Sequence, residues 1–311
     1  MLRPVSILLA VLAVLASAAC ADASPSRDAP AQDRAADERP FTSLVVFGDS
    51  LVDAGNVHLA SSGTRAAASQ GYVAGRFTNG YSYADRIAMS IEGRVTTPSR
   101  AGGNNFAWGG ARALANEDGL PDAAAQVAAW RAASPGRPDP RTLFLLTFGG
   151  NDLRRGGATD ASHREVARSY ADAVRALLAA GARTILVTGA PIPSDAGLAL
   201  QRTLNAELDR IPVANGQRIL RYDFLPLWQR LLTDARSLGF RPWTPEAAAS
   251  AAMPGARRNA GDDCLADRAQ AQGCPGYVLF DRVHPTAAVH ALIARDMSAR
   301  LGVPVADPPA R

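Results

Sequence analysis

The sequence contains no lysine: all 33 of its basic residues are arginine. This absence excludes chemistry that depends on a lysine amine, such as a Schiff base, a Ser-Lys dyad or the lysine of a nucleotide-binding P-loop. The formal net charge is only +4, and the arginines are dispersed along the chain. Because no basic run of the type that binds nucleic acid occurs, we expect no nucleic-acid partner.

Histidine is also scarce, which limits the candidates for a general base. The four histidines are His58, His163, His284 and His290.

With 311 residues, 47% hydrophobic and 20% charged, the chain has an ordinary globular composition and can bury a sizeable core. A fibrous or wholly disordered chain is therefore excluded.

The N-terminal region predicts export. Residues 1–23 combine the positive charge of Arg3 with an apolar stretch at residues 5–15 and then small residues, which is typical of a secretory signal peptide. The stretch is too short to span a bilayer, and no later apolar run is long enough to do so. Cys20 leaves open a lipoprotein signal, in which this cysteine would carry a lipid and associate the protein with a membrane. Residues 24–40 predict a flexible tether, so we expect a periplasmic or secreted protein.

Two cysteines, Cys264 and Cys274, remain when Cys20 is set aside. Export places them in an oxidising compartment, so we expect a disulfide that contributes roughly 3 kcal/mol in the chain-entropy model. The surrounding segment offers only aspartates as further ligands, so we expect no metal site. Two free thiols are the remaining alternative.

Short apolar runs that end in turn residues predict a buried parallel sheet. The runs lie at residues 43–47, 142–148, 184–188 and 218–222. Helical patterns lie at residues 163–180, 199–211, 225–238 and 285–301, the last with Pro285 as its first residue. This alternation predicts an α/β fold with right-handed βαβ units, in one three-layer α/β/α domain over residues 41–305. Ligands bind at the carboxyl ends of the strands in such sheets.

Two of the predicted strands end in turns that carry polar side chains. Ser50 follows the first strand in the run Gly48-Asp49-Ser50, where the N–H groups of a following helix would favour an oxyanion. Asn151 follows the second strand after two glycines and could aim its amide at a substrate oxygen. The alternatives are an ordinary N-cap for Ser50 and turn chemistry alone for Asn151.

Asp281 and His284 lie three residues apart, after a short apolar segment at residues 277–280. At this spacing in a turn, the carboxylate can approach the imidazole and fix its tautomer, as a histidine general base requires. The alternative is an aspartate N-cap beside a surface histidine. Of the other histidines, His163 is expected in the first turn of a helix, and His290 has no aspartate partner before it.

Together these segments resemble the GDSL family, also called SGNH hydrolases. Residues 47–56 (FGDSLVDAGN) are similar to its first block, residues 105–110 (NFAWGG) to its glycine block, residues 149–152 (GGND) to its asparagine block and residues 281–285 (DRVHP) to its final block. The blocks follow the family's order across nearly the whole predicted mature chain. Residues 75–80 (GRFTNG) also resemble a loop that is common in the plant-lipase-like branch.

The resemblance implies a flavodoxin-like sandwich with a central parallel sheet, the SGNH hydrolase fold, and a role for each matching residue. Ser50 would be the nucleophile, His284 the general base and Asp281 its orienting partner. The N–H of Ser50, the N–H of Gly110 and the side chain of Asn151 would form the oxyanion hole.

Some assignments within the blocks stay open. Gly109 is adjacent to Gly110, so either glycine could supply the backbone N–H. Asp49 and Asp53 belong to the first block, and we expect them to brace the turn rather than to act in catalysis. The Gly-x-Ser-x-Gly pattern of the α/β-hydrolase nucleophile elbow is absent around Ser50.

The function that the resemblance implies is the hydrolysis of carboxylic esters, lipid or short-chain, through an acyl-enzyme on Ser50 and without a cofactor. An acyltransferase that uses an alcohol in place of water and a (lyso)phospholipase are alternatives with the same site. A catalytically inactive binding module on the same fold is an alternative of another class. Turnover of a short-chain nitrophenyl ester discriminates between an enzyme and such a module.

Overall fold

The computed structural model describes residues 39–115, 118–156, 159–244, 261 and 263–309. The predicted signal at residues 1–23, with Cys20, and most of the predicted tether lie outside the described residues. Within the described residues, no helix is both long enough and apolar enough to cross a membrane.

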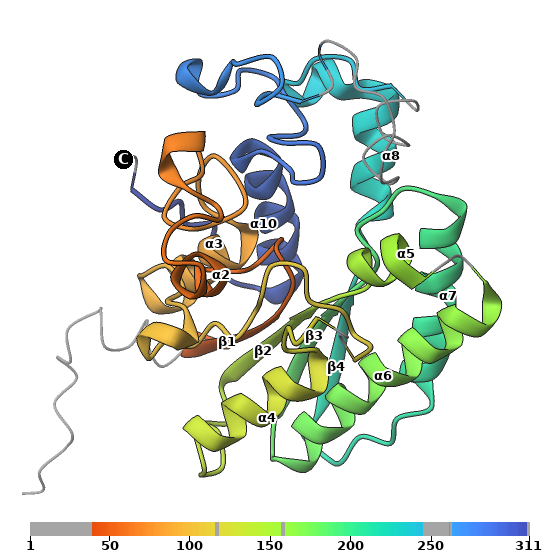
Figure 1. The fold of residues 1–311 in the computed structure, drawn as a ribbon. Coiled ribbons are helices and arrows are strands. Elements are labelled where there is room, and N and C mark those ends of the chain that lie inside the picture. Colours follow the sequence, from red (N-terminus) through yellow and green to blue (C-terminus); the bar gives the residue numbers. More distant parts are fainter. Residues whose placement is uncertain (1–38, 116–117, 157–158, 245–260, 262, 310–311) are drawn as a thin grey trace, which may run out of the picture. The chain divides into compact units, whose positions relative to one another are not determined.

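A parallel sheet lies at the centre of the fold (Figure 1). Its strands follow the order β1-β2-β3-β4, and each neighbouring pair is parallel. The strands span Ser43–Gly48 (β1), Thr142–Thr147 (β2), Thr184–Thr188 (β3) and Arg218–Tyr222 (β4). The strands predicted from the apolar runs are therefore confirmed, with bounds that differ by at most one residue.

The inner strands β2 and β3 are apolar on both faces of the sheet, whereas the edge strand β4 exposes Arg218 and Arg221. In β2, Leu143 and Leu145 pack into the core on one face, while Phe144 and Leu146 pack into the core on the other. All four side chains are fully buried. A strand with this pattern needs a covering layer on each side, so the sequence of β2 demands a three-layer arrangement.

Helices cover both faces of the sheet (Figure 1). The longer helices span Tyr83–Glu92 (α3), Ala123–Ala133 (α4), Asp160–Ala179 (α6), Asp195–Asp209 (α7), Leu225–Asp234 (α8) and Ala287–Leu301 (α10). The shorter ones are Asn56–Ala60 (α2), Gly150–Gly156 (α5) and the 3₁₀ turns Ala68–Gln70 (η1), Ser99–Ala101 (η2), Ala235–Leu238 (η3) and Gln270–Gln272 (η4). Residues of α3, α8 and α10 pack on one face, and residues of α4, α6 and α7 pack on the other. The predicted α/β/α sandwich is confirmed.

Helix boundaries depart from the prediction where capping residues decide them. The closing helix begins after its N-cap Thr286, so Pro285 lies before the helix and is not its first residue. Ser194 caps α7, which therefore starts before the predicted residue 199. The predicted helices do not include α3 or α4, whose starts are fixed by the side-chain caps Ser82 and Asp122.

Candidate active site

The carboxyl end of β1 holds Ser50 in a tight turn. The chain leaves the strand at Gly48, where a Cβ atom would lie only 2.6 Å from the Thr147 carbonyl oxygen. A glycine is required for this close approach of two backbones. The buried Asp49 carboxylate accepts the Leu51 N–H at 3.0 Å, which fixes the turn around Ser50.

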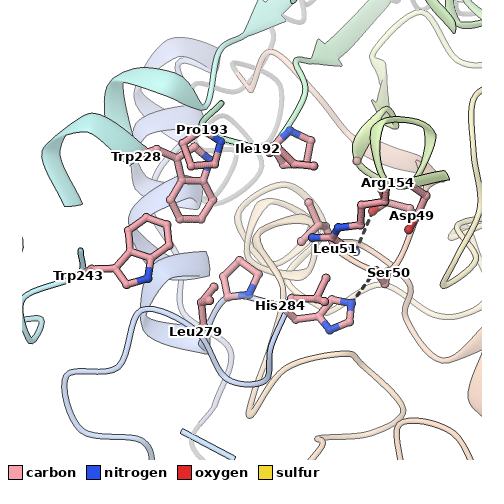
Figure 2. Close-up of a pocket in the computed structure, with 15 residues that line it drawn as sticks. Asp49, Ser50, Leu51, Arg154, Ile192, Pro193, Trp228, Trp243, Leu279 and His284 are labelled. Atoms are coloured by element: carbon pink, nitrogen blue, oxygen red, sulfur yellow. Dashed lines mark hydrogen bonds between the residues drawn. The ribbon is translucent and has the colours of Figure 1, made fainter. Parts of the chain in front are cut away.

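Ser50, His284 and Asp281 are connected by hydrogen bonds. The Ser50 hydroxyl lies 2.8 Å from His284 Nε2 (Figure 2). His284 Nδ1 lies 2.7 Å from one carboxylate oxygen of Asp281 and 2.9 Å from the other. In the neutral imidazole, a proton on Nδ1 faces the carboxylate, which leaves Nε2 to accept the serine proton. The structure thus brings together the side chains of the first and last sequence blocks.

The surroundings of Asp281 keep it ionised. Burial alone would raise its pKa, but the neighbouring His284 and several hydrogen bonds outweigh burial and lower the pKa below its ordinary value. The Val283 and His284 N–H groups each donate at 2.8 Å, and the Tyr72 hydroxyl donates at 2.7 Å. Nothing in the sequence indicates the role of Tyr72, because 209 positions separate it from Asp281.

The other histidines lie in different surroundings. His290 is fully buried in α10, where its Nδ1 accepts the Tyr83 N–H at 3.3 Å and burial lowers its pKa to about 3. His163 is buried on α6, and His58 forms a hydrogen bond with a backbone carbonyl. Among the described hydrogen bonds, only those of His284 join a histidine to both a serine and an aspartate side chain.

Existing hydrogen bonds distinguish the candidate oxyanion donors. The Gly109 N–H donates to the Asp53 carboxylate at 2.9 Å and is therefore occupied. Gly110, with φ +91°, has no hydrogen bond from its N–H to the described residues. The Asn151 amide donates one N–H to the Ala111 carbonyl at 2.9 Å, which leaves its second N–H for a ligand. These contacts favour Gly110 over Gly109.

Asp152 connects the asparagine turn to the glycine turn. Its buried carboxylate accepts the Ala113 N–H at 3.0 Å and the Leu114 N–H at 3.1 Å. Together with the bond between Asn151 and Ala111, these contacts fix the two turns relative to each other. Fixed donors need no reorganisation when charge develops on a substrate.

The acidic residues of the first block brace the turn. Burial raises the pKa of Asp49 to about 6, although the Leu51 N–H and the charges of His284 and Arg154 act in the opposite direction. The Asp53 carboxylate accepts hydrogen bonds from the backbone of two segments. It accepts N–H groups from Gly55, Asn56, Val57 and Gly109.

The loop at residues 75–80 supports His284. Phe77 packs against the His284 ring, with ring centroids 5.1 Å apart. Arg76 anchors the loop to α3 through two hydrogen bonds, of 2.7 and 2.8 Å, to the buried Asp85 carboxylate. The segment that resembles the plant-lipase-like branch therefore supports one face of the imidazole.

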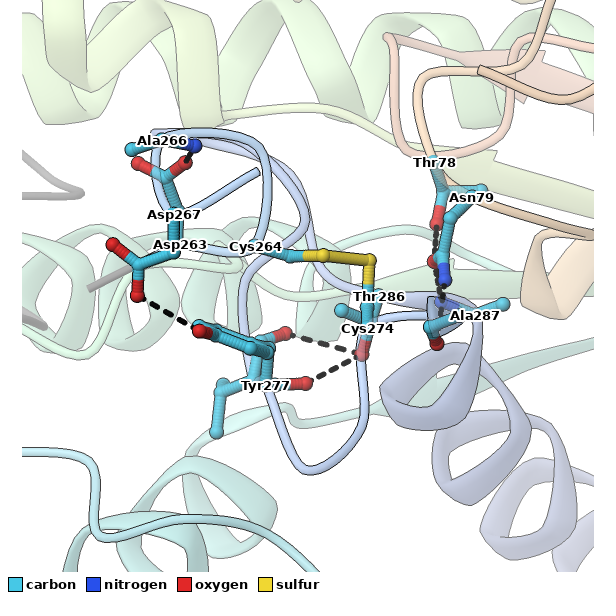
Figure 3. The surroundings of a disulfide bond; sticks show 12 residues. Thr78, Asn79, Asp263, Cys264, Ala266, Asp267, Cys274, Tyr277, Thr286 and Ala287 are labelled. Carbon is cyan, nitrogen blue, oxygen red and sulfur yellow. Dashed lines mark hydrogen bonds between the residues drawn. A yellow bond between two sulfur atoms is a disulfide. The ribbon is translucent and has the colours of Figure 1, made fainter. Parts of the chain in front are cut away.

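The same loop holds the start of α10 (Figure 3). The Thr78 hydroxyl donates to the Pro285 carbonyl at 2.8 Å. Asn79 Oδ1 accepts the N–H of Ala287, the first residue of α10, at 2.8 Å. A side chain from a distant loop thus satisfies a donor at the helix start, immediately after the histidine.

Cys264 and Cys274 form the predicted disulfide (Figure 3). This pairing excludes the alternative of two free thiols. The disulfide packs in one buried cluster with Tyr277 and Phe280, and the Tyr72 ring contacts Phe280 at a centroid distance of 5.0 Å. The disulfide therefore supports the tyrosine that donates to the site's carboxylate.

An apolar pocket opens beside Ser50 and His284 (Figure 2). Its cavity volume is only about 40 Å³, and its mouth is open to solvent. Arg154 of α5 adds a positive charge to the wall, and the sequence gives no sign of this placement. A pocket of this character suits a hydrocarbon chain attached to a reacting ester. Its apolar wall includes Leu51, Ile192, Trp228, Trp243, Leu279 and Val283.

Comparisons with known proteins point to lipases and acyltransferases. The family model for GDSL-like Lipase/Acylhydrolase matches residues 44–297. Lipase 1 of Photorhabdus luminescens is 32% identical over 162 residues, which cover 49% of this chain and 22% of that lipase. Phosphatidylcholine-sterol acyltransferase of Aeromonas hydrophila is 24% identical over 311 residues, covering 84% of this chain and 90% of the acyltransferase. Thermolabile hemolysin of Vibrio parahaemolyticus is 26% identical over 291 residues, covering 85% of this chain and 65% of the hemolysin. The chain thus spans about a fifth of the lipase and under two thirds of the hemolysin.

Proposed function

Because the chain belongs to the GDSL-like lipase/acylhydrolase family, a family of carboxylic ester hydrolases, we propose that it hydrolyses carboxylic esters through an acyl-enzyme on Ser50. The observation that carries the proposal is the chain of hydrogen bonds from Ser50 through His284 to Asp281, at the edge of an apolar pocket. The apolar wall supports an ester with a hydrocarbon chain, the class that includes lipids and (lyso)phospholipids.

In the first half-reaction, His284 Nε2 takes the hydroxyl proton while the Ser50 oxygen attacks the ester carbonyl carbon. The negative oxygen of the tetrahedral intermediate accepts hydrogen bonds from the N–H groups of Ser50 and Gly110 and from the Asn151 amide. The bond to the alcohol oxygen then breaks, and His284 returns the proton to the leaving alcohol. Asp281 stays ionised throughout and stabilises the imidazolium.

In the second half-reaction, a water molecule takes the place of the alcohol. His284 removes a proton from the water, whose oxygen attacks the acyl carbonyl on Ser50. The ester bond to Ser50 breaks, the serine oxygen regains its proton from His284, and the carboxylic acid leaves.

The test is the substitution Ser50→Ala with a short-chain nitrophenyl ester as substrate. We expect nearly all turnover to disappear while the melting temperature stays unchanged, because the lost group acts only in chemistry. A fluorophosphonate probe should label the wild type at Ser50 and leave the variant unlabelled. The matched control is Ser134→Ala at the end of α4, which should keep full activity. More than a tenth of the activity in a folded Ser50→Ala variant would contradict the proposal.

A second candidate function is acyl transfer to an alcohol. The similarity to the phosphatidylcholine-sterol acyltransferase, over 84% of this chain, favours it. The same acyl-enzyme serves both reactions, since an alcohol can attack the acyl carbonyl in place of water. Product analysis with and without added alcohol distinguishes them: a new ester indicates transfer, and free acid alone indicates hydrolysis.

We also propose that the protein is exported. The disulfide between Cys264 and Cys274 supports this, since such bonds persist in oxidising compartments. The mass of the mature chain tests both forms of the proposal. Loss of a leader alone indicates a periplasmic or secreted protein, whereas a lipid on Cys20 indicates a membrane-anchored lipoprotein. An unprocessed chain that stays in the cytoplasm would contradict export.

A further inference from the structure

The pocket beside Ser50 is small and ends at two tryptophans. Ser50 and His284 lie at one end of it, and the rings of Trp228 and Trp243 lie at the other (Figure 2). A cavity needs about 10–15 Å³ to hold one water molecule, so a volume of about 40 Å³ holds about three groups of that size. This is the room that an acyl group of roughly two to four carbons occupies.

The two tryptophans at the far end of the pocket belong to the hydrophobic core. Trp228 of α8 and Trp243, which follows η3, are only 3% and 5% exposed, and their ring centroids lie 5.4 Å apart. Both pack in the core cluster that also contains Leu279 and Val289. Close-packed core side chains cannot move aside for a longer ligand without losing contacts on their other sides. The tryptophans therefore limit the length of a chain that enters from Ser50.

The order of the reaction decides which part of an ester occupies this end of the pocket. The acyl part stays bound to Ser50 when the alcohol leaves, whereas the alcohol must reach solvent before water can attack. The open mouth suits the departing alcohol and the entering water. The apolar side chains that also line the pocket, among them Ile192, Pro193 and Leu279, suit a hydrocarbon chain that stays.

We propose that the protein selects esters whose acyl group is short, roughly two to four carbons, and that Trp228 and Trp243 set this limit. The alcohol part is not limited in the same way, because it lies toward the open mouth of the pocket. The inference rests on the proposed ester hydrolysis and narrows it, since it states which esters the same site prefers.

The experiment compares two isomeric esters, octyl acetate and ethyl octanoate. They contain the same atoms, but the long chain is the alcohol part of the first and the acyl part of the second. The kcat/KM of each is measured from the release of acid, below the concentration at which the ester aggregates. Nitrophenyl acetate and nitrophenyl octanoate form a second pair with a better leaving group, and this pair decides if neither alkyl ester reacts.

The wild type should prefer the ester with the short acyl group in each pair by at least roughly tenfold in kcat/KM, because a longer chain must displace packed side chains. Trp228 and Trp243 are each replaced by phenylalanine and by leucine, which remove increasing amounts of the end wall. The preference should fall by roughly tenfold in at least one of the leucine variants, and by less in the matching phenylalanine variant.

Trp130→Leu is the matched control. Trp130 is a buried tryptophan of α4 that packs in the core cluster on the other face of the sheet. The control loses core packing as the other leucine variants do, but it should keep the wild-type preference. Because a ratio of two kcat/KM values does not depend on the fraction of protein that is folded, a destabilised variant can still be compared.

Two outcomes would overturn the inference while leaving the proposed function intact. The first is a wild type that hydrolyses the octanoates as well as the acetates, or better. The second is a preference for the acetates that every variant of Trp228 and Trp243 keeps unchanged, since the tryptophans would then not set the limit. Failure of the wild type to hydrolyse any of these esters would instead contradict the proposed function, and the inference would fall with it.

Discussion

At the scale of single residues, the imidazole, the carboxylate and the amide of the site are each held by a group that does not react. Asp281 holds the imidazole of His284, the Tyr72 hydroxyl holds Asp281, and the Ala111 carbonyl holds the Asn151 amide. The geometry is therefore set before a substrate arrives, which favours electrostatic stabilisation of a transition state. Substitution of a residue that stabilises developing charge should therefore have a different kinetic effect from substitution of a residue that only positions another side chain.

Asn151→Ala tests the assignment of the amide to the oxyanion hole. We expect kcat to fall by on the order of a hundredfold or more, the usual loss for one such donor. KM should change much less, because the amide serves the tetrahedral oxygen more than the ground-state carbonyl. Steady-state kinetics on a nitrophenyl ester measure both values. An effect confined to KM would place Asn151 in substrate binding instead.

Tyr72→Phe tests a positioning residue. The substitution keeps the ring against Phe280 and removes the hydroxyl that donates to Asp281. We expect kcat/KM to fall by about tenfold. The hydroxyl is one of the hydrogen-bond donors that lower the pKa of Asp281, so its loss should raise that pKa. The acid limb of the kcat/KM profile should therefore move to higher pH.

Tyr81→Phe is the control for this comparison, since Tyr81 lies under the Arg76 guanidinium and not on Asp281. Its pH profile should match the wild type. A Tyr72→Phe variant that loses activity without any movement of the acid limb would indicate a purely structural role for the hydroxyl.

At the scale of elements, the strands were the most predictable features. The run at residues 142–148 is apolar on both faces, and this pattern is sufficient to place β2 in the centre of a covered sheet. Helix α3 also carries a readable pattern, since the buried Tyr83, Ile87 and Ile91 recur at helical spacing. Helix α4 is harder to predict, because alanine on its exposed face weakens the contrast between its two faces. The position of Pro285 is a similar case, since Thr286 fixes where α10 begins.

The residues of the candidate site also divide into those that the sequence predicts and those that it does not. The residues that the blocks name lie on turns, and a turn that needs a particular residue leaves a local trace such as the run Gly48-Asp49-Ser50. Among the supports of those residues, Phe77 lies in the loop at residues 75–80 that the family resemblance singles out. Tyr72 leaves no trace, because its contact with Asp281 joins segments far apart in the chain. Trp228 and Trp243, which line the pocket, belong with Tyr72 in this respect.

The segment that contains the disulfide should act as one unit with the site. Replacing both Cys264 and Cys274 by alanine should lower the free energy of unfolding by about 3 kcal/mol. It should also lower kcat/KM, because the disulfide packs in the cluster that holds Tyr72. Urea unfolding and ester turnover measure the two effects. Reductant should produce both changes in the wild type and neither in the double variant, with free thiols titrated to confirm reduction.

At the scale of the whole molecule, buried titratable groups set the response to acid, and they act in opposite directions. Burial raises the pKa of Asp49 from 3.8 to about 6, so the folded state takes up this proton first and gains stability as pH falls through that window. The pKa of Asp281 is lowered, so its contribution is lost as pH falls below its ordinary value of 3.8. His290 acts in the same direction as Asp281 but at higher pH.

His290→Asn should make the protein less sensitive to acid. Burial lowers the pKa of His290 from 6.5 to about 3, so the unfolded chain binds this proton at a pH where the folded chain does not. The wild type therefore loses stability as pH falls between these two values, by at most about 5 kcal/mol from this group. Asparagine keeps an acceptor for the Tyr83 N–H but does not titrate.

Urea unfolding of both proteins at several pH values measures the difference. At neutral pH the variant should be the less stable one, because asparagine fills the buried site less well than the imidazole does. This deficit should shrink steadily as pH falls below about 6.5, because only the wild type then loses stability by keeping a buried histidine neutral. A difference that stays constant from neutral pH to pH 4 would show that His290 takes up its proton in the folded state as readily as in the unfolded chain, and that its burial in α10 does not resist protonation.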